Sequence, residues 1–211
     1  MTEAKAARYQ SHIKSAFPEA MVELSDQLVN LMTNHPKDRH VVAAAVKAKA
    51  EVIVTFNLKD FPQKSLEPFG VEAQHPDDFL LELCENCTAS SLLQIIKEQA
   101  EALKRPPNTL KDVLGRLSRQ VPNFAGKILC QEYGNDVAKI ARKTLNKAGQ
   151  TLADGEQIYE GKQYCLRQKQ GTLTIIDKRG RGEILKSERG KLEGNLSLDD
   201  IDKFQDVGQI L

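Results

Sequence analysis

The chain has 211 residues, of which 40% are hydrophobic, so it is long enough to form a buried core. Its formal net charge of +1 points to no particular class of charged partner. No stretch approaches the roughly 20 apolar residues of a membrane-spanning helix, and the first residues lack the pattern of a secretion signal. These features predict a soluble, cytoplasmic globular protein with no membrane association.

Hydrophobic spacing predicts helices and two short strands in the first part of the chain. Helical periodicity favours a helix over residues 3–16 and, with an almost wholly apolar composition, over residues 38–50. Residues 51–55 are β-branched and too few for another helix, which indicates a buried strand. Residues 71–73 form a second short strand before a helix that opens at Pro76. This order of elements predicts an α/β fold with a parallel sheet.

The second part of the chain changes from a helical period to a period of two. A helical stripe over residues 136–148 ends at Gly149, and its opposite face carries Lys139, Arg142 and Lys143. Four segments with alternating polarity then follow, separated by glycine-containing turns: QYCLRQ, TLTIID, EILKSE and KLEGNL. They predict a small antiparallel meander.

A final helix follows the meander, because Ser197 and Asp200 have the spacing of a capping box. We expect a domain boundary near residue 130. Residues 1–130 then form the α/β domain, and residues 131–211 form a small α+β module of meander and helix.

Two aspartates frame the first predicted helix and strand. Asp38 stands at the start of the helix, and Asp60 lies beyond the carboxyl end of the strand, where functional groups of parallel sheets collect. Two carboxylates in one cleft can bind Mg²⁺ or Mn²⁺, which activates water for phosphodiester hydrolysis. Aspartate is also a common helix cap and turn residue, so spacing alone favours two structural roles. The histidines, His35 among them, have no metal-binding spacing.

The run DRHVVAAAVKAKAEVIVTFNLKDFP, followed by FGVEAQHPDDFL, resembles the second half of PIN-domain nucleases, in the subgroup that continues into extra C-terminal helices. This family includes the VapC-type toxin ribonucleases, which cleave RNA with a divalent metal ion held by acidic residues. The likeness extends over residues 1–128 and is most specific over residues 38–80. It implies an incomplete PIN-like parallel sheet with flanking helices, joined to the α+β module.

The resemblance also implies roles for individual residues. Asp38 matches the acidic residue of the family's third motif, and Thr55, Phe56 and Asn57 match a fourth motif that usually ends in an acid. Asp38 and Asp60 are then the catalytic residues, Asp38 and Asn57 the ligands of Mg²⁺ or Mn²⁺, and Thr55 the residue that positions the loop. The family's first strand, with its aspartate, and its glutamate-bearing helix have no counterpart before Asp38. We therefore expect weak or no activity from the isolated chain.

Two functions follow from these observations. The resemblance implies a metal-dependent endoribonuclease, the toxin of a toxin–antitoxin pair, with RNA and an antitoxin protein as partners. The alternative is a non-catalytic protein that binds nucleic acid or a partner through its C-terminal module, with Lys139, Arg142, Lys143 and the KRGRG turn at residues 178–182 on phosphates. A solvated helix face explains the same lysines more simply. A homo-oligomer, or a fragment that complements the sheet from its N-terminal side, is a further prediction about partners.

Overall fold

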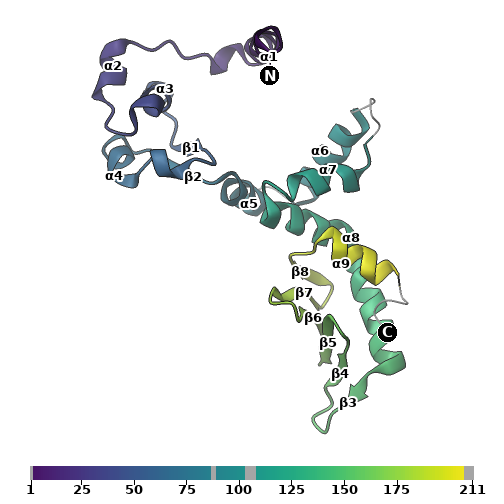
Figure 1. Ribbon diagram of the computed structural model, residues 1–211. Coiled ribbons are helices and arrows are strands. Elements are labelled where there is room, and N and C mark those ends of the chain that lie inside the picture. The colour runs from purple at the N-terminus through teal and green to yellow at the C-terminus, as the bar shows by residue number, and fades with distance from the viewer. Residues whose placement is uncertain (1, 87–88, 103–107, 207–211) are drawn as a thin grey trace. The chain divides into compact units, whose positions relative to one another are not determined.

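The computed structural model describes residues 2–86, 89–102 and 108–206, and it divides into two compact units, residues 1–76 and 77–211 (Figure 1). Residue 130, near which the sequence suggested a boundary, lies inside one continuous helix, α8 (Pro122–Ala148). The buried stripe of α8 extends from Phe124 to Leu145, so the helical pattern begins well before the segment that looked periodic in the sequence. No helix within the described ranges is long and apolar enough to cross a membrane.

The first unit is a small α/β arrangement around a two-stranded parallel sheet. Ile53 of one strand lies opposite Ala73 of the other, and Ile53 is buried with Val42, Phe61 and Leu66 in one apolar cluster. The helices and strands are α1 (Glu3–Ala16), η1 (Pro18–Ala20), α2 (Asp26–Leu31), η2 (Pro36–Asp38), α3 (Arg39–Ala48), β1 (Val52–Val54), η3 (Leu58–Asp60), α4 (Gln63–Leu66), η4 (Glu67–Phe69) and β2 (Glu72–Gln74).

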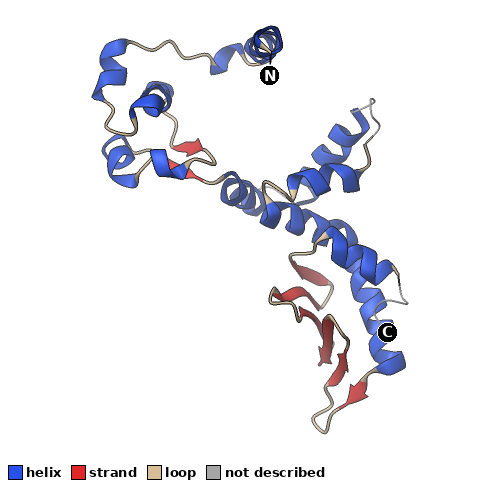
Figure 2. Cartoon of the chain, in the orientation of Figure 1, coloured by secondary structure: helices blue, strands red, loops and turns tan. Residues whose placement is uncertain are grey.

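The second unit combines helices with a six-stranded antiparallel sheet in the order β3-β4-β5-β6-β7-β8 (Figure 2). Its elements are α5 (Pro76–Asn86), α6 (Ala89–Ala102), α7 (Leu110–Leu117), α8, β3 (Gln150–Thr151), β4 (Gln157–Glu160), β5 (Tyr164–Lys169), β6 (Thr172–Asp177), β7 (Gly182–Glu188), β8 (Lys191–Gly194) and α9 (Leu198–Gln205).

Helix α8 packs across one face of this sheet and forms the centre of the second unit. It contacts the strands from β4 to β8, and its buried residues share one core with the inward side chains of the sheet, among them Leu166, Ile175 and Leu185. Because consecutive hairpins alternate, the turns β3–β4, β5–β6 and β7–β8 lie at one end of the meander, and the turns β4–β5 and β6–β7 lie at the other.

The first turn of α8 is closed by a residue from α5. Val121 at the N-cap position provides no side-chain cap, and Pro122 follows it. Instead, the buried carboxylate of Asp77 accepts hydrogen bonds from the backbone N–H groups of Asn123 (3.1 Å) and Phe124 (2.8 Å). These are two of the N–H groups that a helix leaves without intrahelical partners.

The predicted fold class is confirmed: a short parallel sheet with flanking helices precedes an antiparallel module with a terminal helix. Ser197 and Asp200 form the predicted capping box at the start of α9. Two details differ. The meander also includes β3 and β4, and the loop that contains Asp60 includes the short helical turns η3 and α4.

Candidate metal centre

His35, Asp38 and Asp60 come together in the first unit. One ligand atom from each residue lies within 4.8 Å of the other two. Nδ1 of His35 is 4.0 Å from Oδ2 of Asp38, and both side chains are partly exposed, at 44% and 27%. Two segments therefore build the cluster: η2 with the residue before it, and η3, which follows β1.

Backbone hydrogen bonds hold these two segments side by side. The N–H of His35 donates to the carbonyl oxygen of Asp60 (3.4 Å), and the N–H of Asp38 donates to the carbonyl oxygen of His35 (2.9 Å). Pro36 occupies the first position of η2, where its fixed φ suits a helical turn and its missing N–H costs nothing. The sequence His-Pro-Lys-Asp thus forms one tight turn that places His35 and Asp38 on the same side.

Asp38 occupies the N-cap position of α3, but its side chain makes no capping hydrogen bond. Elsewhere in the described chain, Thr109 and Ser197 cap their helices with reciprocal side-chain bonds. An aspartate normally satisfies one of the free N–H groups at this position. The carboxylate of Asp38 is therefore free of a capping bond and can coordinate a metal ion, which a capping aspartate could not do as readily.

Asp60 is held in place as an ionised carboxylate. The side-chain amide of Asn57 donates to Oδ2 of Asp60 (2.6 Å), and the N–H of Asn57 donates to Oγ1 of Thr55 (3.0 Å). The hydrogen bond from Asn57 is the main cause that lowers the pKa of Asp60 below 3.8, and His35 and Lys59 lower it further. The loop after β1 thus stabilises the charged form of this side chain.

The side chain of Asn34 contacts the backbone of Asp60. Its side-chain amide lies 3.5 Å from the carbonyl oxygen of Asp60, and its own carbonyl oxygen accepts a bond from Nε of Arg39 (3.4 Å). The side chain is 3% exposed, and its Oδ1 has no hydrogen-bond partner within the described residues. A buried polar atom of this kind calls for an explanation, such as an ion or water.

The donor set fits a divalent cation. Carboxylate oxygens suit Mg²⁺ and Mn²⁺, and an imidazole nitrogen favours a transition metal such as Mn²⁺ or Zn²⁺ over Mg²⁺. Two carboxylates and one imidazole from partly exposed positions leave other coordination sites for water or phosphate oxygens. The cluster can therefore hold an ion and still present it to a substrate.

The residues singled out in the sequence fall into two groups. Asp38 and Asp60 lie in the cluster, and Asn57 and Thr55 support Asp60 through hydrogen bonds. Lys139, Arg142 and Lys143 lie on α8 in the second unit. Lys139 and Lys143 are exposed, and Nη2 of Arg142 donates to Oγ of Ser187 (3.0 Å).

In the KRGRG turn, which the sequence offered as a phosphate contact, both arginines pair with carboxylates of the fold. Nε of Arg181 donates to Asp177 (2.7 Å), and Arg181 also pairs with Asp200. Arg179 bonds to Asp177 and Asp199, each at 3.2 Å. The turn is thereby fixed to β6 and α9.

His35 is the candidate ligand that the sequence interpretation missed. Its signal was the i, i+3 spacing to Asp38, which places two ligand types on one side of a helical turn. The separation from Asp60 hid the cluster, because the backbone bond from His35 to Asp60 joins residues that are distant in the sequence.

Comparisons with known proteins relate the chain to one family. A family model described as the VapC50 C-terminal domain matches residues 76–130, which include α5, α6, α7 and the start of α8. "Putative ribonuclease VapC50" of Mycobacterium tuberculosis is 48% identical over 105 residues, or 48% of this chain and 60% of that protein. The chain thus matches less than two thirds of its relative's length, and no solved structure matches it. Residues 76–130 are therefore similar to the VapC50 C-terminal domain, and part of the chain is similar to a protein named as a putative VapC ribonuclease.

Proposed function

We propose that His35, Asp38 and Asp60 bind a divalent metal ion and that the protein uses it to hydrolyse phosphodiester bonds of RNA. The observation that carries this proposal is that two carboxylates and an imidazole lie close together. One of these carboxylates, that of Asp38, makes no capping hydrogen bond to α3. The similarity to a protein named as a ribonuclease supports RNA as the substrate.

Some of these side chains would bind the ion, and others hold the binding side chains in position. A bound Mn²⁺ or Mg²⁺ would polarise the phosphodiester and lower the pKa of a bound water. Asp38 and Asp60 supply negative charge for the ion, and Asn57 fixes Oδ2 of Asp60 so that it needs little reorganisation on binding. Thr55 holds the backbone of Asn57 through its hydroxyl.

We propose that this activity is low. The ligands are partly exposed, and electrostatic stabilisation of a transition state weakens where water screens it. With three side-chain ligands, the ion keeps much of its water, so it is held loosely. As a toxin, the protein would slow the growth of a bacterial host when expressed, and an antitoxin would relieve the effect.

Metal binding and RNA cleavage by single variants test the proposal. Asp38→Asn and Asp60→Asn remove one charged ligand each without changing side-chain volume. We expect each to weaken Mn²⁺ binding at least tenfold, read from the electron paramagnetic resonance of free Mn²⁺, and to abolish cleavage of an end-labelled RNA. Asp26→Asn changes the same charge in the first turn of α2 and serves as the matched control.

The control should bind Mn²⁺ and cleave RNA like the unmodified protein. If Asp38→Asn and Asp60→Asn both bind Mn²⁺ with unchanged affinity, the cluster is not a metal site. Retained cleavage with lost Mn²⁺ binding would separate the chemistry from this cluster and would also refute the proposal.

A further inference from the structure

The two-stranded sheet of the first unit leaves one edge of β1 open. The backbone N–H of Thr55 donates to the carbonyl oxygen of Gln74 in β2 (2.9 Å), and the carbonyl oxygen of Glu51 accepts an N–H of the same strand (2.9 Å). In a parallel ladder, alternate residues of a strand bond to the same neighbour, so the odd-numbered residues of β1 face β2. Val52 and Val54 therefore direct their N–H and C=O groups towards the opposite edge, where no backbone group in the described ranges bonds to them.

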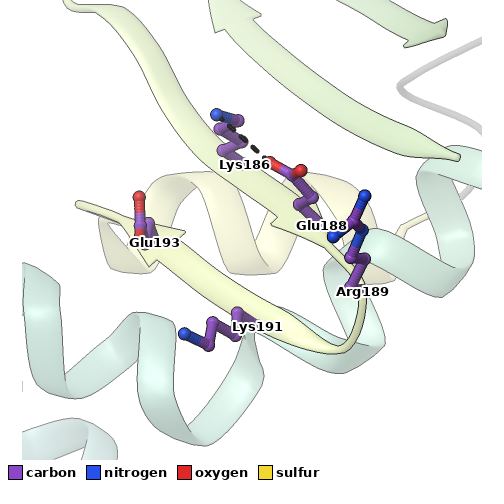
Figure 3. A pocket seen from close by; sticks show the side chains of 5 residues that line it. All are labelled: Lys186, Glu188, Arg189, Lys191 and Glu193. Atoms are coloured by element: carbon purple, nitrogen blue, oxygen red, sulfur yellow. Dashed lines mark ion pairs between the residues drawn. The ribbon is translucent and has the colours of Figure 1, made fainter. Parts of the chain in front are cut away.

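This edge lacks the side chains that usually protect an exposed strand. Proteins place charged residues or proline on open edges, because unpaired backbone groups otherwise pair with another chain. β1 (Val52–Val54) contains neither. Polar side chains occur on the neighbouring β2, at Glu72 and Gln74, and on β8, an edge strand of the other sheet, at Lys191 and Glu193 (Figure 3). The outer edge of β1 is thus open and uncharged.

Apolar side chains beside this edge are also uncovered. Ile53 points into the core, so Val54 points to the other face of the sheet, where it is 44% exposed. Phe56 and Leu58, which follow in the same segment, are 58% and 41% exposed. Two strands alone are at best marginally stable in water, and a third strand would bury more of this surface. The edge is therefore suited to the addition of a strand.

The open groups match those of a second copy of the same strand. Val52 and Val54 are symmetric about Ile53, so an antiparallel β1 with Ile53 opposite Ile53 brings Val52 of each chain opposite Val54 of the other. Each of these two pairs exchanges two backbone hydrogen bonds, as in the closely spaced pairs of an antiparallel ladder. All the outward N–H and C=O groups of both copies are then satisfied.

The charges of the chain are compatible with this pairing. The same register places Glu51 opposite Thr55 of the other copy, so no like charges face each other across the two strands. The formal net charge of +1 also gives little repulsion between two copies. A partner of different sequence would have to supply this match, whereas a second copy already has it.

We propose that the outer edge of β1 pairs with β1 of a second copy of the chain, which joins the two parallel pairs into one sheet in the order β2-β1-β1-β2. The contact uses the same surface on both chains and closes as a dimer. It needs no metal ion and does not depend on the proposed function. Asp60 follows β1, so antiparallel strands place the two metal centres at opposite ends of the joined sheet, each within one chain.

Removal of one outward N–H group tests the pairing. Val54→Pro removes such a group without touching the hydrogen bonds to β2, and proline is tolerated on edge strands when its position faces outwards. Sedimentation equilibrium of the full-length chain over a concentration series should show the average mass rising from one chain towards two. Because Val54→Pro removes two of the four bonds of the dimer, we expect it to raise the dimer Kd about tenfold or more.

Ala73→Pro is the matched control. By the same alternation, the N–H of Ala73 faces the outer edge of β2, so this variant removes an equivalent donor from the other edge of the sheet. We expect it to dimerise like the unmodified protein. A second test variant, Val54→Lys, keeps the N–H and places a charge at the edge, so it should also weaken the dimer. It decides the question if circular dichroism shows that Val54→Pro does not fold.

Hydrogen exchange gives an independent readout of the same contact. The amides of Val52 and Val54 should become protected as the protein concentration rises, both in the unmodified chain and in Ala73→Pro, because dimerisation gives them hydrogen-bond acceptors. In Val54→Lys the amide of Val52 should stay unprotected at concentrations that protect it in the unmodified chain.

Several results would overturn the proposal. A chain that stays monomeric at every concentration excludes pairing with a second copy, and so does a dimer that both test variants leave intact. Loss of the dimer in Ala73→Pro alone would place the contact on β2, and loss in Ile13→Gln alone would place it on the exposed apolar side of α1. The assay contains no metal ion, so an intact dimer without Mn²⁺ binding refutes only the proposed function, and a monomer that binds Mn²⁺ refutes only this inference.

Discussion

At the scale of single residues, the candidate metal centre depends on side chains that do not take their usual structural roles. Asp38 leaves the first turn of α3 uncapped, and Asn57 donates to Asp60 where an acid in that position would repel it. Asparagine at position 57 therefore stabilises the charge of a neighbour. The hydrogen bond from the Asn57 amide explains how Asp60 can stay ionised although it lies close to the carboxylate of Asp38.

His35 should set the preference of the centre for particular metal ions. We expect His35→Gln to weaken binding of Mn²⁺ about tenfold and binding of Mg²⁺ much less, because an imidazole nitrogen contributes more to a transition metal than to Mg²⁺. Competition between the two ions, followed by Mn²⁺ resonance, measures the ratio. His12→Gln, on an exposed position of α1, is the control, and an equal loss for both ions would exclude His35 as a ligand.

Asp177 gives the second unit a defined sensitivity to acid. Burial alone would raise the pKa of this carboxyl, but hydrogen bonds from Arg179 and Arg181 outweigh it and lower the pKa from 3.8 to about 2. The pKa of Asp177 is lower in the folded protein than in the unfolded chain. The ionised carboxylate therefore stabilises the fold fully above pH 3.8, and this stabilisation is lost as the pH falls towards about 2.

We therefore expect the free energy of unfolding to fall over this pH interval, as measured by urea titration with near-ultraviolet circular dichroism. Arg179→Gln removes side-chain donors to Asp177 and should make the fall shallower. Arg116→Gln, an exposed arginine of α7, should leave it unchanged. A steeper fall in Arg179→Gln would contradict this explanation.

At the scale of elements, the longest helix in the described chain depends on a residue outside it. Asp77 accepts two backbone N–H groups of α8 and the side-chain amide of Asn123 (2.9 Å). We expect Asp77→Ala to lower the free energy of unfolding by about 2 to 3 kcal/mol, because it removes the cap and leaves buried donors unsatisfied. Chemical denaturation measures the effect.

The neighbouring Asp78 provides the matched control for this prediction, since it is exposed and lies in the same turn of α5. Asp78→Ala should change stability by no more than about 0.5 kcal/mol. If the two variants were equally stable, the hydrogen bonds of Asp77 to α8 would contribute little.

The sequence predicted most elements because their signals are local. Glu3–Ala16 matches its predicted helix, and Ser197 with Asp200 forms the predicted cap. The start of α8 was missed because its cap comes from Asp77, which is far away in the sequence. The cluster of His35, Asp38 and Asp60 was anticipated only in part for the same reason. Asp38 and Asp60 stood out by position, but the contact that brings His35 to Asp60 depends on tertiary structure.

At the scale of the whole chain, the two units differ in how completely they cover their apolar side chains. Tyr9, Ile13 and Phe17 follow one side of α1 and its end, and each is more than half exposed, at 54%, 53% and 55%. Helix α1 contains no buried residue, whereas α8 has one face of buried residues from Phe124 to Leu145. Protection of backbone amides should follow this contrast.

Hydrogen exchange followed by mass spectrometry measures that contrast. We expect peptides from α1 to exchange within seconds and peptides from α8 to exchange at least a hundredfold more slowly, because an isolated helix of this length is marginal in water. Slow exchange in α1 at low protein concentration would show that this helix is covered in solution, contrary to the prediction.

The bond from Asp77 to α8 has a practical consequence for dividing the protein. Residues 77–211 form a compact unit, and the family match begins at residue 76, so a cut just after this point would look harmless. A fragment that starts at Asp78 would carry all of α8 but would lack the carboxylate that closes its first turn. Crystallisation or nuclear magnetic resonance of the C-terminal unit should therefore use fragments that begin before Pro76, so that Asp77 keeps its place in α5.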